Sequence, residues 1–432
     1  MDRITTMNMN LPQAYRIRQH FPATRLKDVG AAVTAALSKL NLGGVIKPGD
    51  SVAVPVGSRG IANIALIIKS TVDYLKSLGA EPFIVPAMGS HGGGTAEGQA
   101  QVIASYGVTE AAMGVEIRSS METVIVDQTP HGIPVHFDKN AYAADHVLVC
   151  GRVKPHTRFV GDIESGLHKM MLIGLGKHEG AKIYHRAIED HSFEEIIKAV
   201  AASVLKKCSV IGGLAIVENS YDETGMIEAV APENFYEREK ELLEIARQWL
   251  PRLPFPKIDL LIVDRIGKNI SGSGMDACVV GRKFNDHAAT ERDVVACKRI
   301  MIRGLTEETH GNACGIGLAE FTNERTVAGV DWQSTRINTI TGSHPTAGMV
   351  PLVYPNDREA IEAALQTVGL VEPETSGIVQ IYDTLELSEV VVSETYLEEI
   401  NSRDDLDIIS GPFDLPFDAE GNLASVFKKP QH

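Results

Sequence analysis

The residues best suited to chemistry lie in one segment that is unusually rich in basic side chains. Five of the 14 histidines fall between positions 154 and 191, among lysines, arginines and glycines. Such a cluster can hold a polyanionic ligand, bind a metal ion through neutral imidazole and transfer protons near neutral pH. The alternative, a solvated basic loop, is less favoured because this acidic chain has gathered positive charge beside glycines. The basic residues are Lys154, His156, Arg158, His168, Lys169, Lys177, His178, Lys182, His185, Arg186 and His191.

Two further loops carry candidate ligand-binding groups. Arg59 follows Ser58 directly after a strand-like run, where a guanidinium can pair with a carboxylate or phosphate through two hydrogen bonds. His91 precedes Gly92 and Gly93, small residues that let a ligand approach the backbone and leave N–H groups facing an anion. Taken singly, each loop is equally consistent with a bland role, as a surface arginine or as a glycine-rich turn with a solvated histidine.

The segments that carry these loops alternate between strand-like and helix-like patterns. Residues 51–57 and 81–89 are apolar runs typical of buried strands, and residues 61–78 between them repeat apolar side chains at helical spacing. The basic segment follows another strand-like run, and Ser192 with Glu195 predicts a helix start through a capping box. This rhythm predicts βαβ units in a largely parallel sheet, whose ligands gather in the loops after the carboxyl ends of the strands.

A proline-rich segment divides the chain. It follows the helical pattern of residues 232–250, and Pro251, Pro254 and Pro256 prevent that helix from continuing. We therefore predict an α/β protein of two domains, each with a largely parallel or mixed sheet flanked by helices, with the active site in the cleft between them. The predicted parts are an N-terminal cofactor-binding and catalytic domain (1–250), a linker (251–257), a C-terminal α/β domain (258–395) and a tail expected to pack back on the first domain (396–432).

Charge and composition narrow the function classes. A formal net charge of −15 argues against nucleic acid or an anionic membrane as the main partner. No run approaches the ~20 apolar residues of a membrane span, and the first residues lack an apolar signal core, so we expect a cytoplasmic protein. The five cysteines are scattered and form no CxxC pair, which indicates neither a disulfide framework nor a cysteine-based zinc site.

The order of these motifs resembles that of the nickel-dependent lactate racemase family. Sixteen positions separate Lys169 from His185, the spacing that this family has between its nucleotide-carrying lysine and its nickel-ligating histidine. The resemblance covers roughly residues 10–250 and fades in the second domain. The matching features are Ser58-Arg59, Gly89-Ser90-His91, Lys154-Pro155-His156, Phe159-Val160-Gly161, Lys169 followed by Ile173-Gly174, and His185.

The resemblance implies a role for each matching residue. Lys169 would carry a nickel-pincer nucleotide through a thioamide link, and His185 would ligate the nickel. His91 and His156 would be the paired acid/base residues, and Arg59 would anchor the substrate carboxylate. Enzymes that build the cofactor would be the protein partners. Further contacts with the nucleotide are expected from Ser58, Gly92, Gly93 and Lys177.

The activity that the resemblance implies is a racemase or epimerase of a 2-hydroxy acid. The α hydrogen beside a carboxylate is poorly acidic, so the pincer ring would take it as hydride and return it to the other face. Two histidines would then serve the two hydroxyl orientations. Asp162, Glu164 and His168 depart from the lactate-specific pattern and leave the identity of the substrate open. The second domain is expected to add substrate contacts beside a glycine-rich stretch, from Lys268, Asn269, Asp276 and Arg282.

Two other functions stay open at the level of the sequence. The histidine cluster could bind another divalent ion and serve a hydro-lyase or a hydrolase, which metal analysis would distinguish. The same scaffold could also be a non-catalytic hydroxy-acid or nucleotide-binding protein. The presence of all five functional positions disfavours that second reading: Arg59, His91, His156, Lys169 and His185.

Overall fold

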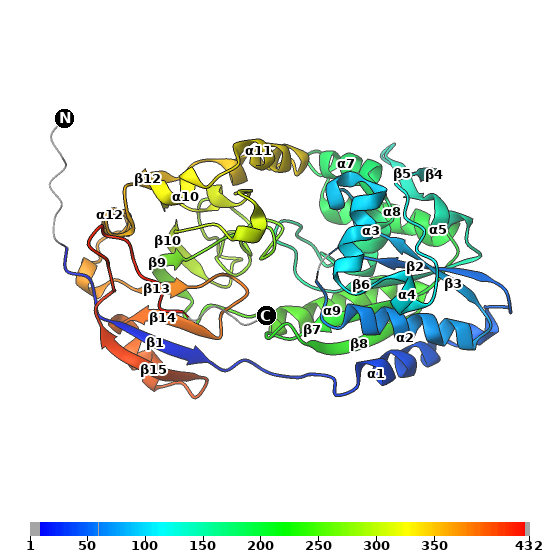
Figure 1. Cartoon of the computed structure of the whole chain (residues 1–432), viewed down its shortest axis with the longest axis horizontal. Coiled ribbons are helices and arrows are strands. Elements are labelled where there is room, and N and C mark those ends of the chain that lie inside the picture. The colour runs from blue at the N-terminus through cyan, green and yellow to red at the C-terminus, as the bar shows by residue number, and fades with distance from the viewer. Residues whose placement is uncertain (1–8, 59, 428–432) are drawn as a thin grey trace. The chain divides into compact units, whose positions relative to one another are not determined.

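The structure is a computed structural model that describes residues 9–58 and 60–427. The chain folds into two compact units, which are described separately below (Figure 1). Unit 2 comprises residues 22–250, and unit 1 comprises the chain up to position 21 together with everything from position 251 onward. Both units consist of sheets flanked by helices, which confirms the predicted α/β class.

Unit 2 is built on a five-stranded sheet with the strand order β3-β2-β6-β7-β8. The first four strands run parallel, and β8 is antiparallel to β7. The helix α2 (Ile64–Ser77) connects β2 to β3, so the predicted βαβ unit is present. The strands are β2 (Ser51–Val56), β3 (Glu81–Pro86), β6 (His146–Arg152), β7 (Val210–Glu218) and β8 (Thr224–Val230), with a separate hairpin of β4 (Thr123–Gln128) and β5 (Pro134–Asp138).

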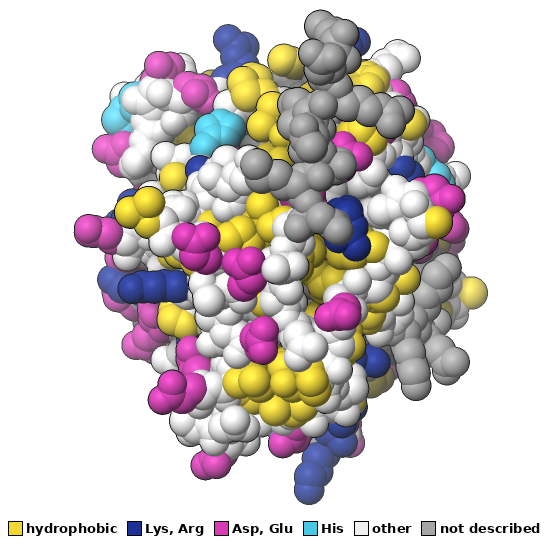
Figure 2. All heavy atoms as spheres, turned by 90° about the vertical axis from the view of Figure 1, so that its left-hand side faces the viewer, with side chains coloured by type: hydrophobic (Ala, Val, Ile, Leu, Met, Phe, Trp, Pro, Cys, Tyr) yellow, Lys and Arg dark blue, Asp and Glu magenta, His cyan; other side chains and the backbone are white. Residues whose placement is uncertain are grey.

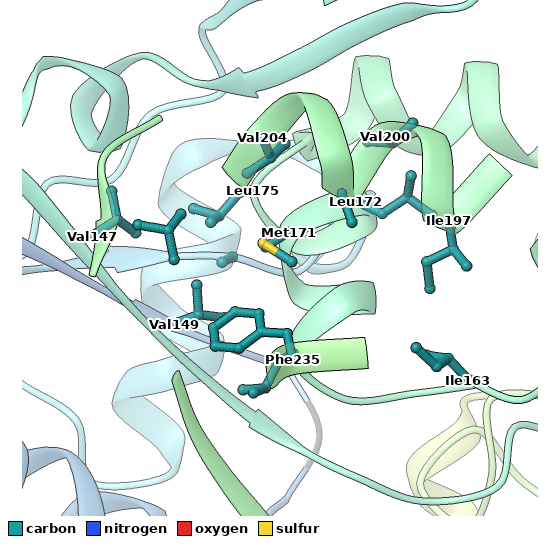
Figure 3. Packing of buried hydrophobic residues seen from close by; sticks show 14 of the residues in the cluster. Val147, Val149, Ile163, Met171, Leu172, Leu175, Ile197, Val200, Val204 and Phe235 are labelled. Atoms are coloured by element: carbon teal, nitrogen blue, oxygen red, sulfur yellow. The ribbon is translucent and has the colours of Figure 1, made fainter. Parts of the chain in front are cut away.

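The parallel strands of unit 2 contribute side chains to two hydrophobic cores, one on each face of the sheet. In β2, Val52 packs into one core and Ala53 into the other, and in β6 the same alternation separates Leu148 from Val149. Successive side chains of a strand point to opposite faces, so a strand that is covered on both faces reads as a continuous apolar run. Figure 3 shows the second core, where Val149 lies close to Phe235.

Helices cover both faces of this sheet and connect its strands. Residues of α1 (Val29–Leu37) and α2 line one core, and residues of α8 (Phe193–Lys207) and α9 (Phe235–Trp249) line the other. The predicted capping box at the start of α8 is confirmed, because Ser192 and Glu195 each accept from the backbone of the other. Unit 2 also contains the α-helices α3 (Ala96–Ser105), α4 (Glu110–Met113), α5 (Lys139–Ala143), α6 (Leu167–Lys169) and α7 (Lys177–Ala187), and the π-helical η4 (Met170–Gly174).

Unit 1 contains an eight-stranded mixed sheet with the order β12-β11-β10-β9-β13-β14-β1-β15. The strands from β12 to β13 are parallel, and those from β13 to β15 alternate in direction. The strands are β9 (Lys257–Val263), β10 (Ala296–Ile302), β11 (Phe321–Asn323), β12 (Leu352–Tyr354), β13 (Ile378–Ile381), β14 (Glu389–Ser393), β1 (Ala14–Gln19) and β15 (Leu406–Phe413). The helices are α10 (Glu324–Ala328), α11 (Trp332–Thr341), α12 (Asp357–Leu365) and α13 (Leu397–Asn401).

The structure differs from the predicted domains at both ends of the chain. The units separate after Leu250, where the proline-rich segment begins, but β1 lies in unit 1 between β14 and β15. Ile17 of β1 is fully buried in the core of unit 1. This burial stabilises β1 in unit 1, although the residues that follow it in sequence form unit 2. The C-terminal tail also packs on unit 1 rather than on the N-terminal domain, since β15 pairs with β1 and Leu423 joins the core beside α12.

The surface agrees with the acidic composition. On the face in Figure 2, lysine and arginine side chains are scattered among acidic and hydrophobic ones rather than gathered in one patch. Among the described helices, none is both long and apolar enough to cross a membrane. All five cysteines are free thiols.

Candidate active site

The three loops singled out in the sequence leave the same edge of the unit 2 sheet. The strands β3, β2 and β6 are adjacent and parallel, so their carboxyl ends lie side by side. Ser58 follows β2, His91 follows β3 and His156 follows β6. The strand order therefore brings these loops to the edge where parallel sheets bind ligands. Arg59 lies outside the described residues, so its place in the site stays a prediction.

Glycines allow two of these loops to pack tightly on η4. A Cβ atom added to Gly57 would lie 3.2 Å from Met170 Cε, and one added to Gly89 would lie 3.0 Å from Ile173 Cγ2. Gly89 also has a φ of +61°, in the left-handed region that favours glycine. The loops after β2 and β3 therefore contact the helical segment that begins directly after Lys169.

His91 precedes a glycine turn that a buried glutamine holds in place. The side-chain amide of Gln99 donates to the carbonyl of Gly89 at 2.8 Å and to that of His91 at 3.3 Å. A Cβ atom added to Gly92 would lie 2.6 Å from the backbone nitrogen of Gln99, so this position requires glycine for steric reasons. A Cβ added to Gly93 would meet no atom within 4 Å. Anion binding by Gly92 and Gly93 stays a prediction.

His156 is oriented by its own loop. Its Nδ1 accepts from the backbone N–H of Arg158 at 3.1 Å and from that of Phe159 at 3.0 Å. The backbone N–H of His156 donates to Glu164 Oε2 at 2.8 Å, and the other carboxylate oxygen accepts from Arg247 Nη2 at 2.8 Å. Glu164 is 1% exposed, so a residue noted in the sequence as a departure from the lactate pattern holds the His156 loop.

Phe159 brings three of the predicted site residues together. Its ring centroid lies 4.0 Å from that of His156, in a stacked arrangement, and 5.7 Å from that of His185. The Lys169 Nζ lies 5.5 Å from the same centroid. Phe159 also stacks on Phe193, the first residue of α8, at 3.9 Å. One aromatic ring therefore links the loop after β6, the end of α6 and the face of α7.

His185 lies among positive charges, and this environment keeps its imidazole neutral. Burial is the largest cause, followed by the charges of Lys169 and Arg158, and together they lower the pKa of His185 to about 4. An imidazole with this pKa has an unprotonated nitrogen at neutral pH and can ligate a metal ion. Within residues 9–58 and 60–427, no group of three or more His, Cys, Asp and Glu side chains is placed to hold a metal ion.

His178, which the sequence analysis named in the basic segment without assigning it a role, lies on the same face of α7 as His185. The two are seven positions apart, about two helical turns. The Nδ1 of His178 is buried and has no hydrogen-bond partner among the described residues. A Cβ atom added to Gly94 would lie 3.5 Å from this nitrogen, so the glycine turn after His91 packs against His178. The seven-residue spacing from His185 was the signal that could have assigned it to the site.

Lys177 is placed differently from the expectation. Its side chain is fully buried, its Nζ forms an ion pair with Asp138 Oδ2 at 2.9 Å, and it also donates to the carbonyl of Pro86. Lys177 has a φ of +55°, an uncommon conformation for a residue other than glycine. Its ammonium is committed to the protein interior, so we assign it a structural role and leave it out of the nucleotide contacts.

The four candidate residues of unit 1 follow β9, as expected. Lys268 donates to the carbonyl of Gly272 at 2.6 Å, and Asn269 accepts from the Thr306 hydroxyl at 2.6 Å. The carboxylate of Asp276 accepts from the backbone N–H two positions later at 2.9 Å. These contacts shape the glycine-rich stretch itself, and substrate binding by these three residues stays a prediction.

Arg282, the fourth candidate, is more deeply buried than expected of a substrate contact. Its side chain is fully buried, and its guanidinium donates to the carbonyl of Cys297 at 2.9 Å and to Glu320 Oε1 at 3.0 Å. These bonds tie the glycine-rich stretch to β10 and to the loop before β11. The Arg282 Nε has no hydrogen-bond partner among the described residues, and substrate binding by Arg282 stays a prediction.

The chain resembles known proteins in sequence and in fold. Residues 5–196 match the family model of the lactate racemase N-terminal domain. No curated protein matches the sequence of the chain. The structure of the lactate racemase apoprotein from Thermoanaerobacterium thermosaccharolyticum is similar over 87% of this chain and 99% of its own, with a TM-score of 0.54 and 15% identity. A crystal structure of a protein from Thermotoga maritima is similar over 66% of this chain and 72% of its own, with a TM-score of 0.45 and 14% identity.

Proposed function

We propose that the protein is a racemase or epimerase of a 2-hydroxy acid, because residues 5–196 match the family model of the lactate racemase N-terminal domain. The family match supports an isomerase, and the structural likeness supports the shared fold. The proposal goes further, to a nickel-pincer nucleotide carried by Lys169 and ligated through His185. One observation carries it: Lys169, His185 and His156 surround the ring of Phe159.

The residues present fit such a group. A covalent link needs a lysine amine, and the Lys169 Nζ lies beside the same ring as the His185 imidazole. Ligation needs a neutral imidazole, and the lowered pKa of His185 provides one. Lys169 and Arg158 both act on His185 electrostatically, which gives the site the positive charge that suits an anionic nucleotide. When bound, the nickel-pincer group would supply reversible hydride acceptance at the substrate α carbon.

The protein itself would bind the substrate and handle its hydroxyl proton. Arg59 would hold the carboxylate through two charge-assisted hydrogen bonds, so Arg59→Lys should already raise KM because an ammonium does not reproduce the planar fork. His91 and His156, on neighbouring loops, would address the substrate hydroxyl. Substrate contacts from Lys268, Asn269 and Asp276 of unit 1 are part of the same proposal, as are the enzymes that build the cofactor as partners.

The alternative of a hydrolase or hydro-lyase with another divalent ion gains no support from the side chains. Such an ion takes most of its ligands from the protein, and the described part of the chain offers no group of three or more suitable side chains. A single neutral imidazole fits a metal whose other ligands come from the nucleotide. For this reason the racemase remains the function that the site supports best.

The proposed reaction is tested by following the α hydrogen. The protein is produced together with the cofactor-building enzymes and incubated in D₂O with single enantiomers of a panel of 2-hydroxy acids. We expect the opposite enantiomer to form without deuterium at the α carbon, because hydride moves between substrate and cofactor. Deuterium incorporation at that carbon would indicate proton abstraction and contradict the hydride route. The Lys169→Ala variant is the control, which we expect to form no product.

A further inference from the structure

The three residues that depart from the lactate-specific pattern all bond to one helix, α9. The pairs are Asp162 with Lys240, Glu164 with Arg247 and His168 with Glu239. In the first two pairs at least one side chain is exposed, whereas the side chains of His168 and Glu239 are only 4% and 1% exposed. Solvent therefore screens the contact between His168 and Glu239 least, and this contact lies directly beside Lys169 in the sequence.

Lys169 ends a helix that is too short to fix its own position. The helix α6 has three residues, and its N-cap residue, Gly166, has no side chain to accept from the first backbone N–H groups. A single helical turn is unstable in water without contacts from other elements. One such contact is Leu167, which is fully buried in the core of unit 2. A second comes from α9.

Glu239 supplies the cap that Gly166 lacks. Its Oε2 accepts from the backbone N–H of His168 at 3.1 Å and from the Nδ1–H of the same residue at 3.0 Å. A Cβ atom added to Gly166 would lie 2.6 Å from Glu239 Oε1, so the carboxylate lies directly against the backbone at the start of α6. Oε1 is buried and has no hydrogen-bond partner among the described residues. Within the described part of the chain, this carboxylate therefore bonds to His168 through one oxygen.

We propose that Glu239 is a positioning residue for Lys169, and that it acts through the acceptor oxygen that holds His168. This inference rests on the proposed function, in which the Lys169 amine carries the nucleotide. The amine lies 5.5 Å from the centre of the Phe159 ring, and a small displacement of a reacting group slows bond formation strongly. The effect of Glu239 on this amine passes through the backbone of α6.

Two neutral replacements of similar length isolate the acceptor oxygen. Both remove the negative charge of Glu239, but the side chain of Glu239→Gln can still accept from His168, whereas that of Glu239→Met cannot. We therefore expect the glutamine variant to behave like the wild type and the methionine variant to be impaired. Lys240→Met is the control on the same helix, because it removes only an exposed ion pair. Urea unfolding establishes that unit 2 is folded in each variant.

The placement of the amine can be measured in the apoprotein. The protein is treated with a limiting amount of acetic anhydride, and acetylation of Lys169 is compared by peptide mass spectrometry with that of Lys182, whose side chain is 50% exposed. We expect the ratio in Glu239→Met to rise about threefold or more, because a released segment exposes the amine. The ratios in Glu239→Gln and Lys240→Met should match the wild type. An unchanged ratio in folded Glu239→Met would overturn the proposal.

Loading with the nucleotide gives a second measurement. The variants are produced for a fixed time together with the cofactor-building enzymes, and the covalently modified fraction is read from the intact mass. We expect this fraction to fall about tenfold in Glu239→Met and to stay at the wild-type level in Glu239→Gln and Lys240→Met. A loss in Glu239→Gln as large as that in Glu239→Met would show that the acceptor oxygen is not what matters, and the proposal would be wrong.

A glycine variant covers the case in which Glu239→Met does not fold. Gly166→Ala displaces the carboxylate through its added Cβ but keeps the charge and the acceptor, and we expect the acetylation ratio to rise as in the methionine variant. Gly43→Ala is its control, since its added Cβ would lie 3.7 Å from Leu78 Cδ2, an ordinary contact. An unchanged ratio in Gly166→Ala would also contradict the proposal.

The two measurements separate this inference from the proposed function. If the wild type gained no covalent mass, the proposed linkage to Lys169 would fail. The acetylation ratio needs no cofactor and would still decide whether Glu239 positions Lys169.

Discussion

At the scale of the residue, the candidate site depends on a neutral imidazole held beside an amine. His185 and Lys169 both lie next to the ring of Phe159, and the charge of Lys169 is one reason why the pKa of His185 is low. Burial is the larger reason, because it penalises the charged imidazolium. The same burial leads us to expect an apoprotein whose stability falls in acid.

The acid sensitivity gives a prediction for the apoprotein. The pKa of His185 is about 4 in the folded state, below its ordinary value of about 6.5 in the unfolded chain. Between these values the unfolded state binds a proton that the folded state does not, so stability falls as the pH falls through this window. We expect a loss of about 3 kcal/mol, measured by urea unfolding at a series of pH values.

A phenylalanine variant isolates this contribution. His185→Phe has no imidazole to protonate, so the difference in unfolding free energy between wild type and variant should change across the window, whereas other acid-sensitive groups cancel. Parallel pH dependences for the two proteins would mean that His185 is not held neutral by its surroundings.

The sequence predicted the polar members of the site but not how they meet. Lys169, His185, His91 and His156 could be selected because their types and spacing follow ordered motifs. The role of Phe159 could not, because it depends on stacking against a helix more than thirty positions later. Burial was equally hidden, so the sequence assigned Lys177 and Arg282 to ligands although both are fully buried in ion pairs.

At the scale of the element, one buried ammonium connects α7 to the end of β3. Lys177, the first residue of α7, bonds to the carbonyl of Pro86 at the end of β3 and forms an ion pair with Asp138, which caps α5. The loop with His91 follows β3, and His185 lies on α7, so this ammonium links the elements that carry both histidines. Its left-handed backbone conformation shows that the surrounding structure determines its place.

Removing this ammonium should destabilise unit 2. In Lys177→Met the carboxylate of Asp138 stays buried without its partner, and breaking a buried pair costs about 3–5 kcal/mol. Lys182→Met is a matched control on the same helix, since its ion pair with Glu179 is exposed and is worth at most about 1 kcal/mol. Unfolding free energies from urea titration compare them, and equal small effects would remove Lys177 from its structural role.

Elements with strong local signals were predictable, and those that depend on distant partners were not. The helix after β2 and the capping box at Ser192 are encoded by apolar spacing and by two side chains, and both are present. The three-residue strands β11 and β12 have too few positions for an alternating pattern. The π-helical η4 has no sequence signal of its own, since its hydrogen bonds differ from those of an α-helix only by one position.

At the scale of the whole molecule, the chain begins in unit 1, forms unit 2 and returns to unit 1. The strand β1 lies between β14 and β15, whose residues are more than 370 positions away in the sequence. The prolines after residue 250 marked where the chain leaves unit 2, but nothing local indicates that β1 belongs to a sheet formed so much later. A pairing over this distance cannot be read from one strand alone, which is why the predicted N-terminal domain included these residues.

Substitution in β1 should therefore weaken unit 1 and not unit 2. Ile17 is fully buried, and Ile17→Ala should cost about 2–5 kcal/mol through lost burial and a cavity. Calorimetry or proteolysis with mass analysis should show the loss in residues 251–427, with residues 22–250 unaffected. Arg18→Ala, at a half-exposed position of the same strand, is the control and should change little. A loss confined to unit 2 would contradict the assignment of β1.

The central claim is that Lys169 and His185 together hold one nickel-containing nucleotide. The most direct test is the intact mass and the nickel content of protein produced with the cofactor-building enzymes present, for wild type, Lys169→Ala and His185→Ala. Lys182→Ala, on the exposed face of α7, controls for the loss of a lysine in the same segment.

We expect a covalent mass increase and about one nickel per chain for the wild type and for Lys182→Ala. We expect no mass increase in Lys169→Ala, and loss of nickel in both Lys169→Ala and His185→Ala, because the tether and the imidazole act on the same group. If Lys169→Ala and His185→Ala both retained stoichiometric nickel and full activity, the assignment of the site would be wrong.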